Sequence, residues 1–568
     1  MFIVRFSGAL AVMLMAAVST AATRPGVLAY TSPSGIVFEV DESGLASVRC
    51  NGRELAGGGL RVFNGETFFR DSGTKAVRAG APEEKSITVM SDRSARVRHA
   101  AGDIVATFDY DFDGEDMHLA VRVENNHPAD YMNIIGLAGL LFRFDSPPRG
   151  LMQTQHISYF QAHGVGLMHP GHWSRIGGSY AVDDGAGVGI SPWNTGLMRT
   201  LILWDYASWA ADKREKDPQR KLLYFAQRPV PPRGAATIEL MVRVSTNRDW
   251  RHLLDPYRKH FQQTFGAVRY RADYRWIATD YLNHSQKAVS PANPYGFHGG
   301  HRRIDTPEGA KLFCDTLIPA LRDNGAQGVI VWGQGGDDAR GAMYRPDFDV
   351  LPPEVQTNLP EIIKRFAEAN LKFGVTTRPR HIAVRADWKH DSVIEINGDD
   401  PAHREMLWRR FDNMMRIGCR LFYLDSFGNS LEDVKLMRFL REKLGPDVLT
   451  FAEHQCDAIM PFSGGYSETT FRAGSEGKPS SYALWSGLRN WEIYQWLCPG
   501  AQMASRLYQI EGRIASTDEQ PDAFFLRNRI MPLVPWSGDR ARLAVLGQLQ
   551  PKFLDGNDRW RENAPAQP

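Results

Sequence analysis

The spacing of apolar residues divides the chain into three parts. From about Val27 to Ser245, short runs such as GIVFEV, DIVATFDYDF, HLAVRVEN and TIELMVRV alternate apolar with polar positions, and turn signals such as Asn51-Gly52 separate them. Alternation with a period of two is typical of strands that bury one face, and helical spacing is scarce here. Residues 23–245 are therefore predicted to form an antiparallel β-sandwich.

The segment 246–271 changes to helical spacing. Its sequence DWRHLLDPYRKHFQQTF places four apolar residues on one stripe, namely Leu253, Leu254, Tyr257 and Phe261. This pattern predicts a helical linker between the sandwich and the rest of the chain.

Residues 272–568 repeat a strand-then-helix pattern. The apolar runs WIATDYL, GVIVWG, KFGVTT, RLFYLD and VLTFAE alternate with amphipathic stretches at 306–323, 359–370 and 401–417. Such repetition predicts a parallel sheet covered by helices, and the length of this part fits a (β/α)8 TIM-type barrel. The runs AIMPF, AQMAS and LAVLG are expected to supply the sixth, seventh and eighth strands. A doubly wound open sheet is the main alternative, but no GxGxxG or P-loop stretch follows a strand.

The N-terminal residues MFIVRFSGALAVMLMAAVSTAATRP combine one early arginine, an apolar run and small residues around Ala22. This combination predicts a secretory signal peptide over residues 1–22 and export to the periplasm or the extracellular space. The apolar run is short for a membrane span, and no later window of about 20 residues is free of charge, so no membrane span is expected.

Composition narrows the range of partners. The formal net charge is only +2 and no basic run is interleaved with aromatic residues, so nucleic-acid binding is not expected. The 14 Trp, 18 Tyr and 29 Phe residues include rings that suit sugar faces, although most are expected in the cores. The five cysteines are widely spaced and show neither zinc spacing nor a dense disulfide framework.

Two sets of residues invite a metal interpretation. Four histidines lie within 17 residues, but their spacings match no common metal motif, so loop histidines facing a neighbouring cleft are favoured: His156, His163, His169 and His172. Four aspartates lack the regular spacing of a calcium loop: Asp337, Asp338, Asp399 and Asp400. No metal or other cofactor is expected.

Two acidic residues end consecutive predicted strands. The run RLFYLD ends on Asp425, a predicted helix follows, and VLTFAE ends on Glu453. The strands of a βαβ unit lie parallel and usually adjacent, so both acids are expected at the C-terminal face of the barrel, where such enzymes have their active sites. Neighbouring strands lie about 4.8 Å apart, and retaining glycosidases hold two carboxyl groups about 5 Å apart. Asp425 is therefore predicted to be the nucleophile and Glu453 the general acid/base; alternatively, either acid caps the following helix or pairs with an arginine.

An Asp ending the fourth barrel strand and a Glu ending the fifth, behind an N-terminal β-sandwich, resemble the endo-α-N-acetylgalactosaminidase and related α-N-acetylgalactosaminidase families. The resemblance covers the architecture and the stretch 372–455, and it implies that Asp425 is the nucleophile and Glu453 the acid/base. The order of the two acids is also similar to that of the α-amylase clan, although Tyr423 stands where that clan has an arginine.

A second resemblance concerns the α-galactosidase clan. KFGVTTRPR followed by FYLDSFG is similar to the third and fourth strands of that clan, which also has its nucleophile on the fourth strand. Its acid/base is an Asp after the sixth strand, near which this chain has Glu468 in SGGYSETT. Glu453, Glu468 and a later carboxylate such as Asp518, which precedes Glu519, therefore stay open as the acid/base.

Further polar and aromatic residues follow predicted strands and are expected to face the same cleft. Asp and Arg side chains suit sugar hydroxyls, and Trp suits a pyranose face, although the arginines alternatively make ion pairs that shape the loops. The predicted substrate-binding residues are Asp280, Trp332, Asp337, Asp338, Arg378, Arg380, His381 and His454.

These patterns predict an exported retaining α-glycosidase that acts on α-linked galactose, N-acetylgalactosamine or a similar sugar of an oligosaccharide or glycan. A catalytically silent carbohydrate-binding or scaffolding protein on the same fold is the alternative from another class. A metal-dependent hydrolase is the third possibility, weakened by the lack of HxH or HExxH in the barrel half.

Overall fold

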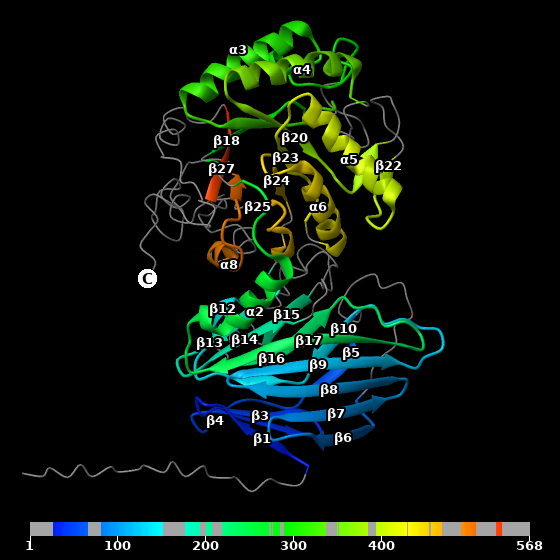
Figure 1. Ribbon diagram of the computed structural model, residues 1–568, viewed down its shortest axis with the longest axis vertical. Helices are drawn as coiled ribbons and strands as arrows, with labels where there is room; N and C mark the ends of the chain where they lie inside the picture. Colours follow the sequence, from blue (N-terminus) through cyan, green and yellow to red (C-terminus); the bar gives the residue numbers. More distant parts are fainter. Residues whose placement is uncertain are drawn as a thin grey trace, which may run out of the picture.

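The computed structural model describes residues 26–65, 81–151, 176–193, 200–206, 218–271, 274, 276–283, 289–336, 349, 351–383, 393–428, 430–453, 456–467, 490–506 and 530–536. Two antiparallel sheets lie at one end of the molecule and a closed parallel barrel lies at the other (Figure 1). The predicted fold class, a β-sandwich followed by a TIM-type barrel, is confirmed. The predicted signal peptide lies outside the described residues, and no helix among those described is long and apolar enough to cross a membrane.

The first sheet has nine strands among the described residues, in the order β1-β2-β3-β4-β11-β16-β10-β5 with β15 paired to β16. They are β1 (Leu28–Thr31), β2 (Val37–Asp41), β3 (Gly44–Cys50), β4 (Arg53–Gly57), β5 (Arg61–Asn64), β10 (Ile135–Ala138), β11 (Leu141–Arg143), β15 (Thr200–Tyr206) and β16 (Gln219–Ala226).

The second sheet has, in the part of the chain that the structure describes, eight strands in the order β12-β13-β14-β17-β9-β8-β7-β6. They are β6 (Glu84–Val89), β7 (Ser94–Ala101), β8 (Ile104–Asp113), β9 (Asp116–Asn125), β12 (Arg149–Leu151), β13 (Ser179–Val182), β14 (Gly187–Pro192) and β17 (Gly234–Ser245). The inward residues of both sheets form one core, which contains the fully buried Phe38 of the first sheet and Phe108 of the second.

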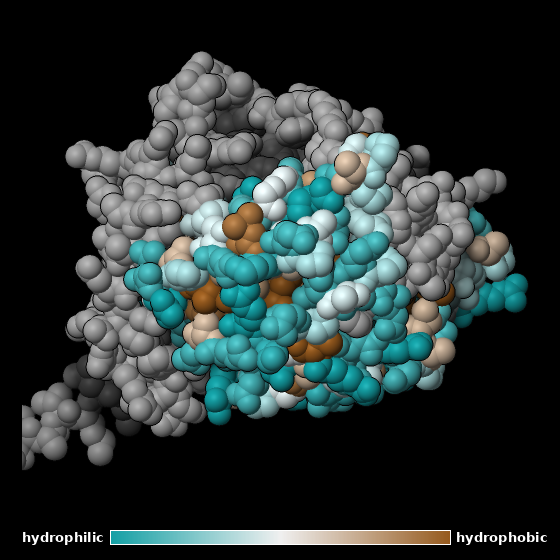
Figure 2. All heavy atoms as spheres, turned by 90° about the horizontal axis from the view of Figure 1, so that it is seen from above, coloured by the Kyte–Doolittle hydropathy of each residue, from teal (hydrophilic) through white to brown (hydrophobic). Residues whose placement is uncertain are grey.

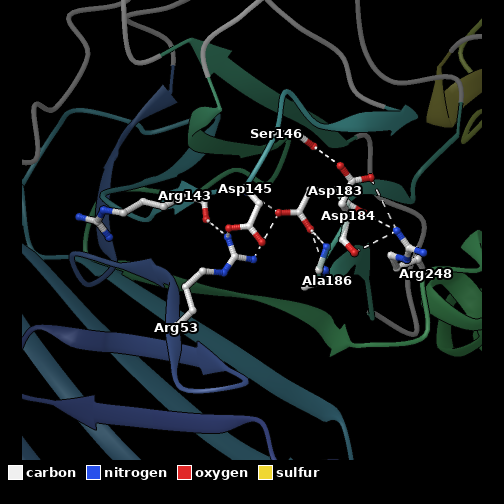
Figure 3. Close-up of polar contacts among 9 residues, drawn as sticks. Arg53, Arg143, Asp145, Ser146, Asp183, Asp184, Ala186 and Arg248 are labelled. Carbon is white, nitrogen blue, oxygen red and sulfur yellow. Dashed lines mark hydrogen bonds and ion pairs between the residues drawn. The ribbon is translucent and has the colours of Figure 1, made fainter.

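A buried carboxylate ties one end of the sandwich together (Figure 3). Asp183, in the turn between β13 and β14, is 1% exposed and accepts hydrogen bonds from the backbone N–H groups of Gly185 (2.8 Å) and Ala186 (2.7 Å). It also accepts from the N–H of Asp145 and lies 3.3 Å from the guanidinium of Arg53 on β4. Backbone hydrogen bonds outweigh burial and lower the pKa of Asp183.

Helix α2 (Trp250–Phe265) joins the two halves of the molecule. Asp249 caps its first turn, and the predicted stripe is buried. One side packs on the sandwich, where Gly187 and Gly189 of β14 leave room for Leu253. The stripe also belongs to the core that contains the barrel helices, and Trp250 lies edge-on to Trp496. The segment predicted to be a linker is therefore a packed element of the interface.

The barrel closes through eight parallel strands in the order β18-β19-β20-β23-β24-β25-β26-β27, with β27 paired to β18. They are β18 (Ile277–Tyr281), β19 (Gly328–Trp332), β20 (Lys372–Thr377), β23 (Leu421–Leu424), β24 (Leu449–Ala452), β25 (Gly464–Ser467), β26 (Met503–Arg506) and β27 (Ile530–Pro535). A separate hairpin follows β20 and consists of β21 (His381–Ala383) and β22 (Val393–Glu395).

Three helices of the barrel half, α3, α5 and α6, begin at residues whose side chains cap the first turn. Thr306 caps α3 with a proline in the next position, and Ser430 and Asp433 form a capping box at the start of α6. The helices described here are α3 (Pro307–Asp323), α4 (Pro353–Glu368), α5 (Pro401–Arg416), α6 (Leu431–Leu444) and α8 (Asn490–Leu497), with the short 3₁₀ turns η4 (Gly300–Arg302) and η7 (Asp457–Ile459).

The end of the molecule seen from above carries mostly hydrophilic side chains among the described residues, and the apolar ones lie in small separate groups (Figure 2). Leu312 on α3 is one of the few large apolar residues with substantial exposure, at 47%. The described part of this face therefore has the character of a surface in contact with water.

Two of the predicted late strands are wrong. AIMPF forms η7 and the turn after it, and the sixth strand is β25, which begins at Gly464. LAVLG lies outside the described residues, and the strand that closes the barrel is β27. AQMAS overlaps β26, as predicted. Short apolar runs do not distinguish a strand from a buried turn, which explains the errors.

Candidate active site

Asp425 and Glu453 follow neighbouring strands at the same end of the barrel. Leu424 of β23 is paired in register with Ala452 of β24, and Glu453 N–H donates to Leu424 O at 3.1 Å. The two acids are therefore the next residues of two adjacent parallel strands, as predicted. Adjacent parallel strands lie about 4.8 Å apart, which is close to the separation that a retaining carboxylate pair requires.

The alternation of side chains along these strands directs both acids inward. Leu421, Tyr423, Leu449 and Phe451 belong to the core inside the barrel, whereas Phe422 and Ala452 belong to the core shared with the helices. Because successive side chains of a strand point to opposite faces, positions 425 and 453 continue the inward series.

The turn after Asp425 contacts Glu453 directly. Ser426 has a left-handed backbone conformation with φ of 51°, and its N–H donates to Glu453 Oε2 at 2.6 Å. Its hydroxyl lies 3.3 Å from Asp425 Oδ2. A positive φ is uncommon for a residue with a side chain, so this turn is held in place by its surroundings. Among these is Phe427, which is fully buried immediately after it.

Arg378 supplies a cation to this pair. It follows β20 on the inward side, two residues after Thr376, and its Nε donates to Asp425 Oδ2 in an ion pair. The Asp425 side chain is 12% exposed and that of Arg378 is 26% exposed, so the pair is open to solvent on one side. A guanidinium at this distance stabilises the ionised form of a carboxylate.

Glu453 has a raised pKa. Burial is the main cause, and the neighbouring charge of Asp425 adds to it. Hydrogen bonds from Ser426 N–H and from the side chain of Tyr423, together with the charge of Arg378, act in the opposite direction without cancelling the rise. A carboxyl group with a raised pKa beside a second carboxylate is the arrangement expected of an acid paired with a nucleophile.

Aromatic side chains form a layer below the two acids. Trp332, at the end of β19, is 2% exposed, stacks on Tyr281 with ring centroids 5.3 Å apart, and lies 4.9 Å from the ring of Tyr423. Trp332 thus lies in the floor of the barrel mouth, and the partly exposed Tyr281 is next to it. Stacking of Trp332 on a sugar stays a prediction.

Asp280 is placed away from the acid pair. Ile277 of β18 faces the barrel interior and Ala278 faces the helices, so Asp280 shares the outer side with Ala278. It is 2% exposed, and its carboxylate pairs with Arg302 at 2.8 Å and His301 at 3.2 Å. These contacts fasten η4 to the end of β18, and a role of Asp280 in binding sugar stays a prediction.

Arg380 and His381 belong to the hairpin that follows β20. Arg380 donates to Glu395 Oε1 at 2.8 Å and lies 3.7 Å from the buried carboxylate of Asp433. His381 is paired with Glu395 in the register of β21 and β22. The structure therefore brings Arg378, but not Arg380, to Asp425.

Several predicted site residues lie outside the described residues. They are Asp337, Asp338, His454, Glu468, Asp518, Glu519 and the four histidines between 156 and 172. Within the described part of the chain, no group of three or more His, Cys, Asp and Glu side chains is arranged to hold a metal ion.

Two residues near the acid pair were not predicted from the sequence. Tyr423 bonds to Glu453, and Tyr281 lies beside Trp332. Both occupy inward positions of strands, one or two residues from an acid. Counting every second residue back from each acid would have found Tyr423, whereas β18, which is buried on both faces along most of its length, offered no such signal.

Comparison with solved structures gives the same architecture. α-N-Acetylgalactosaminidase NagBb from Bifidobacterium bifidum, as a quadruple mutant, matches with a TM-score of 0.59 and 13% sequence identity, covering 92% of this chain and 92% of that chain. Its complex with GalNAc matches with a TM-score of 0.58, 13% identity and the same coverage. No protein-family model and no curated protein matches the sequence. The predicted resemblance to α-N-acetylgalactosaminidases is thus confirmed for the fold.

Proposed function

We propose that this protein is a retaining α-glycosidase with Asp425 as the nucleophile and Glu453 as the general acid/base. The observation that supports it most is the pairing of the two acids on adjacent strands, with Asp425 next to Arg378 and Glu453 retaining its proton to higher pH. A raised pKa suits Glu453 to donate a proton in the first step of a double displacement.

In the first step, Asp425 attacks the anomeric carbon while Glu453 donates its proton to the leaving oxygen, which gives a covalent glycosyl-enzyme. Loss of that proton leaves Glu453 ionised, and the hydrogen bonds from Ser426 N–H and Tyr423 stabilise the charge. Glu453 then removes a proton from the water that attacks the intermediate, and the anomeric configuration is retained.

Arg378 has two roles in this proposal. It pairs with the Asp425 carboxylate before attack, and it shares its donors with a sugar hydroxyl once the carboxylate has formed the covalent bond. Its partial exposure beside Asp425 supports contact with substrate.

The substrate class follows from the fold likeness together with this site. A protein named α-N-acetylgalactosaminidase has the same two-part architecture over most of both chains, which supports an α-linked galactose or N-acetylgalactosamine as the sugar. The remaining predicted contacts, from Asp337, Asp338, His381 and His454, belong to the proposal as sugar-binding residues. Export through the N-terminal segment 1–22 is also part of it.

The test uses a panel of aryl α- and β-glycosides with the unsubstituted protein, Asp425→Ala and Glu453→Ala. We expect turnover of an α-galactoside or α-N-acetylgalactosaminide and a loss of about 10³-fold or more in Asp425→Ala. Azide should rescue Asp425→Ala and give a glycosyl azide of inverted configuration, whereas rescue of Glu453→Ala should give the retained configuration.

Other outcomes point elsewhere. Full activity in both variants would exclude these acids, and rescue of Asp425→Ala with retained configuration would exclude it as the nucleophile. Sugar binding without any turnover would favour the silent carbohydrate-binding protein.

A further inference from the structure

The connection that follows β24 and begins with Glu453 is unusually short. Only 11 residues, 453–463, separate β24 from β25, and those described contain η7 and no longer helix. A regular crossover between parallel strands takes a dozen or more residues and usually a full helix. Ala458 and Ile459 of η7 share their core with Leu254 and Tyr257 of α2. This turn therefore belongs to the same apolar core as α2, which packs on the sandwich.

Gly177 is the point of contact between the sandwich and this turn. It lies two residues before β13, and its N–H donates to Asp457 Oδ2 at 2.7 Å and to the hydroxyl of Tyr257 at 3.1 Å. The second oxygen of Asp457 accepts from Ala458 N–H at 2.7 Å. A Cβ at position 177 would lie 3.0 Å from the Tyr257 hydroxyl and 3.3 Å from Asp457 Oδ2, so a side chain here would crowd both groups.

The turn held by Gly177 is also bonded to the loop that carries the nucleophile. Cys456 N–H donates to Gly428 O at 2.8 Å, and Gly428 is three residues after Asp425. Gly428 N–H in turn donates to the buried carboxylate of Asp433 at 3.0 Å. Asp457, four residues after Glu453, therefore anchors a segment that contacts both acid-bearing loops.

We propose that Asp457 is a positioning residue: by accepting the Gly177 N–H, it fastens the loop after β24 to the sandwich and thereby fixes the position of Glu453. The kinetic part of this inference rests on the proposed function, whereas the anchoring does not. The pKa of Asp457 is raised to about 6 by burial, so the carboxylate is ionised at neutral pH and accepts both backbone N–H groups.

The kinetic test compares Asp457→Ala with Asp457→Asn, which keeps a carbonyl oxygen for Gly177. An acid catalyst matters most for poor leaving groups, so kcat/KM is measured on a phenyl α-glycoside and on its dinitrophenyl analogue. A displaced Glu453 should lower kcat/KM of Asp457→Ala by about 10- to 100-fold on the phenyl glycoside and by less than about 3-fold on the analogue. Asp457→Asn should stay within about 3-fold of the unsubstituted protein on both. An equal loss on both substrates would overturn the positioning role.

The anchoring is tested by hydrogen exchange, which needs no substrate. Asp457→Ala should accelerate exchange in the segments 421–430 and 449–460, and Asp457→Asn should not. The matched control is Asp183→Ala, which removes a buried carboxylate that also accepts backbone N–H groups but lies in the sandwich, and it should leave both segments unchanged. Unchanged protection in Asp457→Ala would overturn the anchoring whether or not any glycoside is turned over, whereas absence of turnover in the unsubstituted protein refutes only the proposed function.

Discussion

Replacing Asp457 by asparagine should change how the stability of the protein depends on pH. Loss of hydration raises the pKa of the carboxyl to about 6 from an ordinary value of 3.8, and this outweighs the hydrogen bonds from the N–H groups of Gly177 and Ala458, which lower it. Since the folded pKa is raised, the folded state holds the proton more tightly than the unfolded state between these two values. The contribution of this group to stability is therefore fully present below about pH 4 and is lost as the pH rises through about 6.

The magnitude follows from the two pKa values. One pKa unit corresponds to about 1.36 kcal/mol, so a difference of about 2 units corresponds to about 3 kcal/mol at pH 7. The asparagine side chain of the variant would carry no charge at any pH and would still accept the Gly177 N–H. We expect the unfolding free energy of Asp457→Asn, relative to the unsubstituted protein, to rise by about 3 kcal/mol between about pH 4 and pH 7.

The assay is urea unfolding of both proteins at several pH values, with the difference taken at each pH so that all other titrating groups cancel. Asp183→Asn is the control, because the stability contribution of Asp183 should depend on pH in the opposite direction. The pKa of Asp183 is lowered, so its contribution is present above the unfolded value and lost as the pH falls, and the cost of Asp183→Asn should be largest at neutral pH. A difference for Asp457→Asn that is flat with pH, or that has the sign of the control, would refute this account of the buried carboxyl.

Three further predictions concern the site and the barrel. Tyr423→Phe removes a hydrogen bond that lowers the pKa of Glu453, so the basic limb of the kcat/KM profile should move to higher pH; an unmoved limb would contradict this. Arg378→Leu should lower kcat/KM by about 10-fold or more with little change in unfolding free energy, and Arg378→Lys should retain part of the lost kcat/KM. Equal kcat/KM in the unsubstituted protein and both variants would show that the ion pair with Asp425 is not important for activity. Arg441 is 3% exposed and donates hydrogen bonds to three backbone carbonyls and to the hydroxyl of a threonine. Arg441→Met should therefore lower the unfolding free energy in urea by about 3–5 kcal/mol, whereas Arg438→Met, at an exposed position of the same helix, should lower it by less than about 0.5 kcal/mol. Equal losses in the two variants would refute the role of burial.

Local chemistry explains how much of the fold the sequence predicted. The alternation of apolar and polar residues in β8, β9 and β17 matches the burial along these strands, because one face of each strand lies in the core and the other is more accessible to solvent. The ends of α3 and α6 coincide with Thr306, Ser430 and Gly445, because capping depends on residues next to the helix. The same local reading placed Asp425 and Glu453 at equivalent strand ends.

The orientation of residues in the barrel was less accessible to the sequence. A barrel strand is buried on both faces, so its apolar run does not alternate and gives no sign of which side is the interior. Asp280 therefore looked equivalent to Asp425, although the structure places it on the outer side of β18 with Arg302. The predictions of the sixth and eighth strands were wrong for a related reason, because a short apolar run is compatible with a buried turn as well as with a strand.

Local sequence was enough to predict the order of sandwich and barrel, the helices with their caps, and the two acids that end consecutive strands, because each depends on residues close together in the chain. Three contacts emerged only from the folded molecule: Arg378 pairs with Asp425, α2 takes part in the covering of the barrel, and Gly177 holds Asp457. The two polar contacts join residues 47 and 280 positions apart, and they form only when the barrel closes and docks against the sandwich. No local pattern of polar and apolar residues encodes that step.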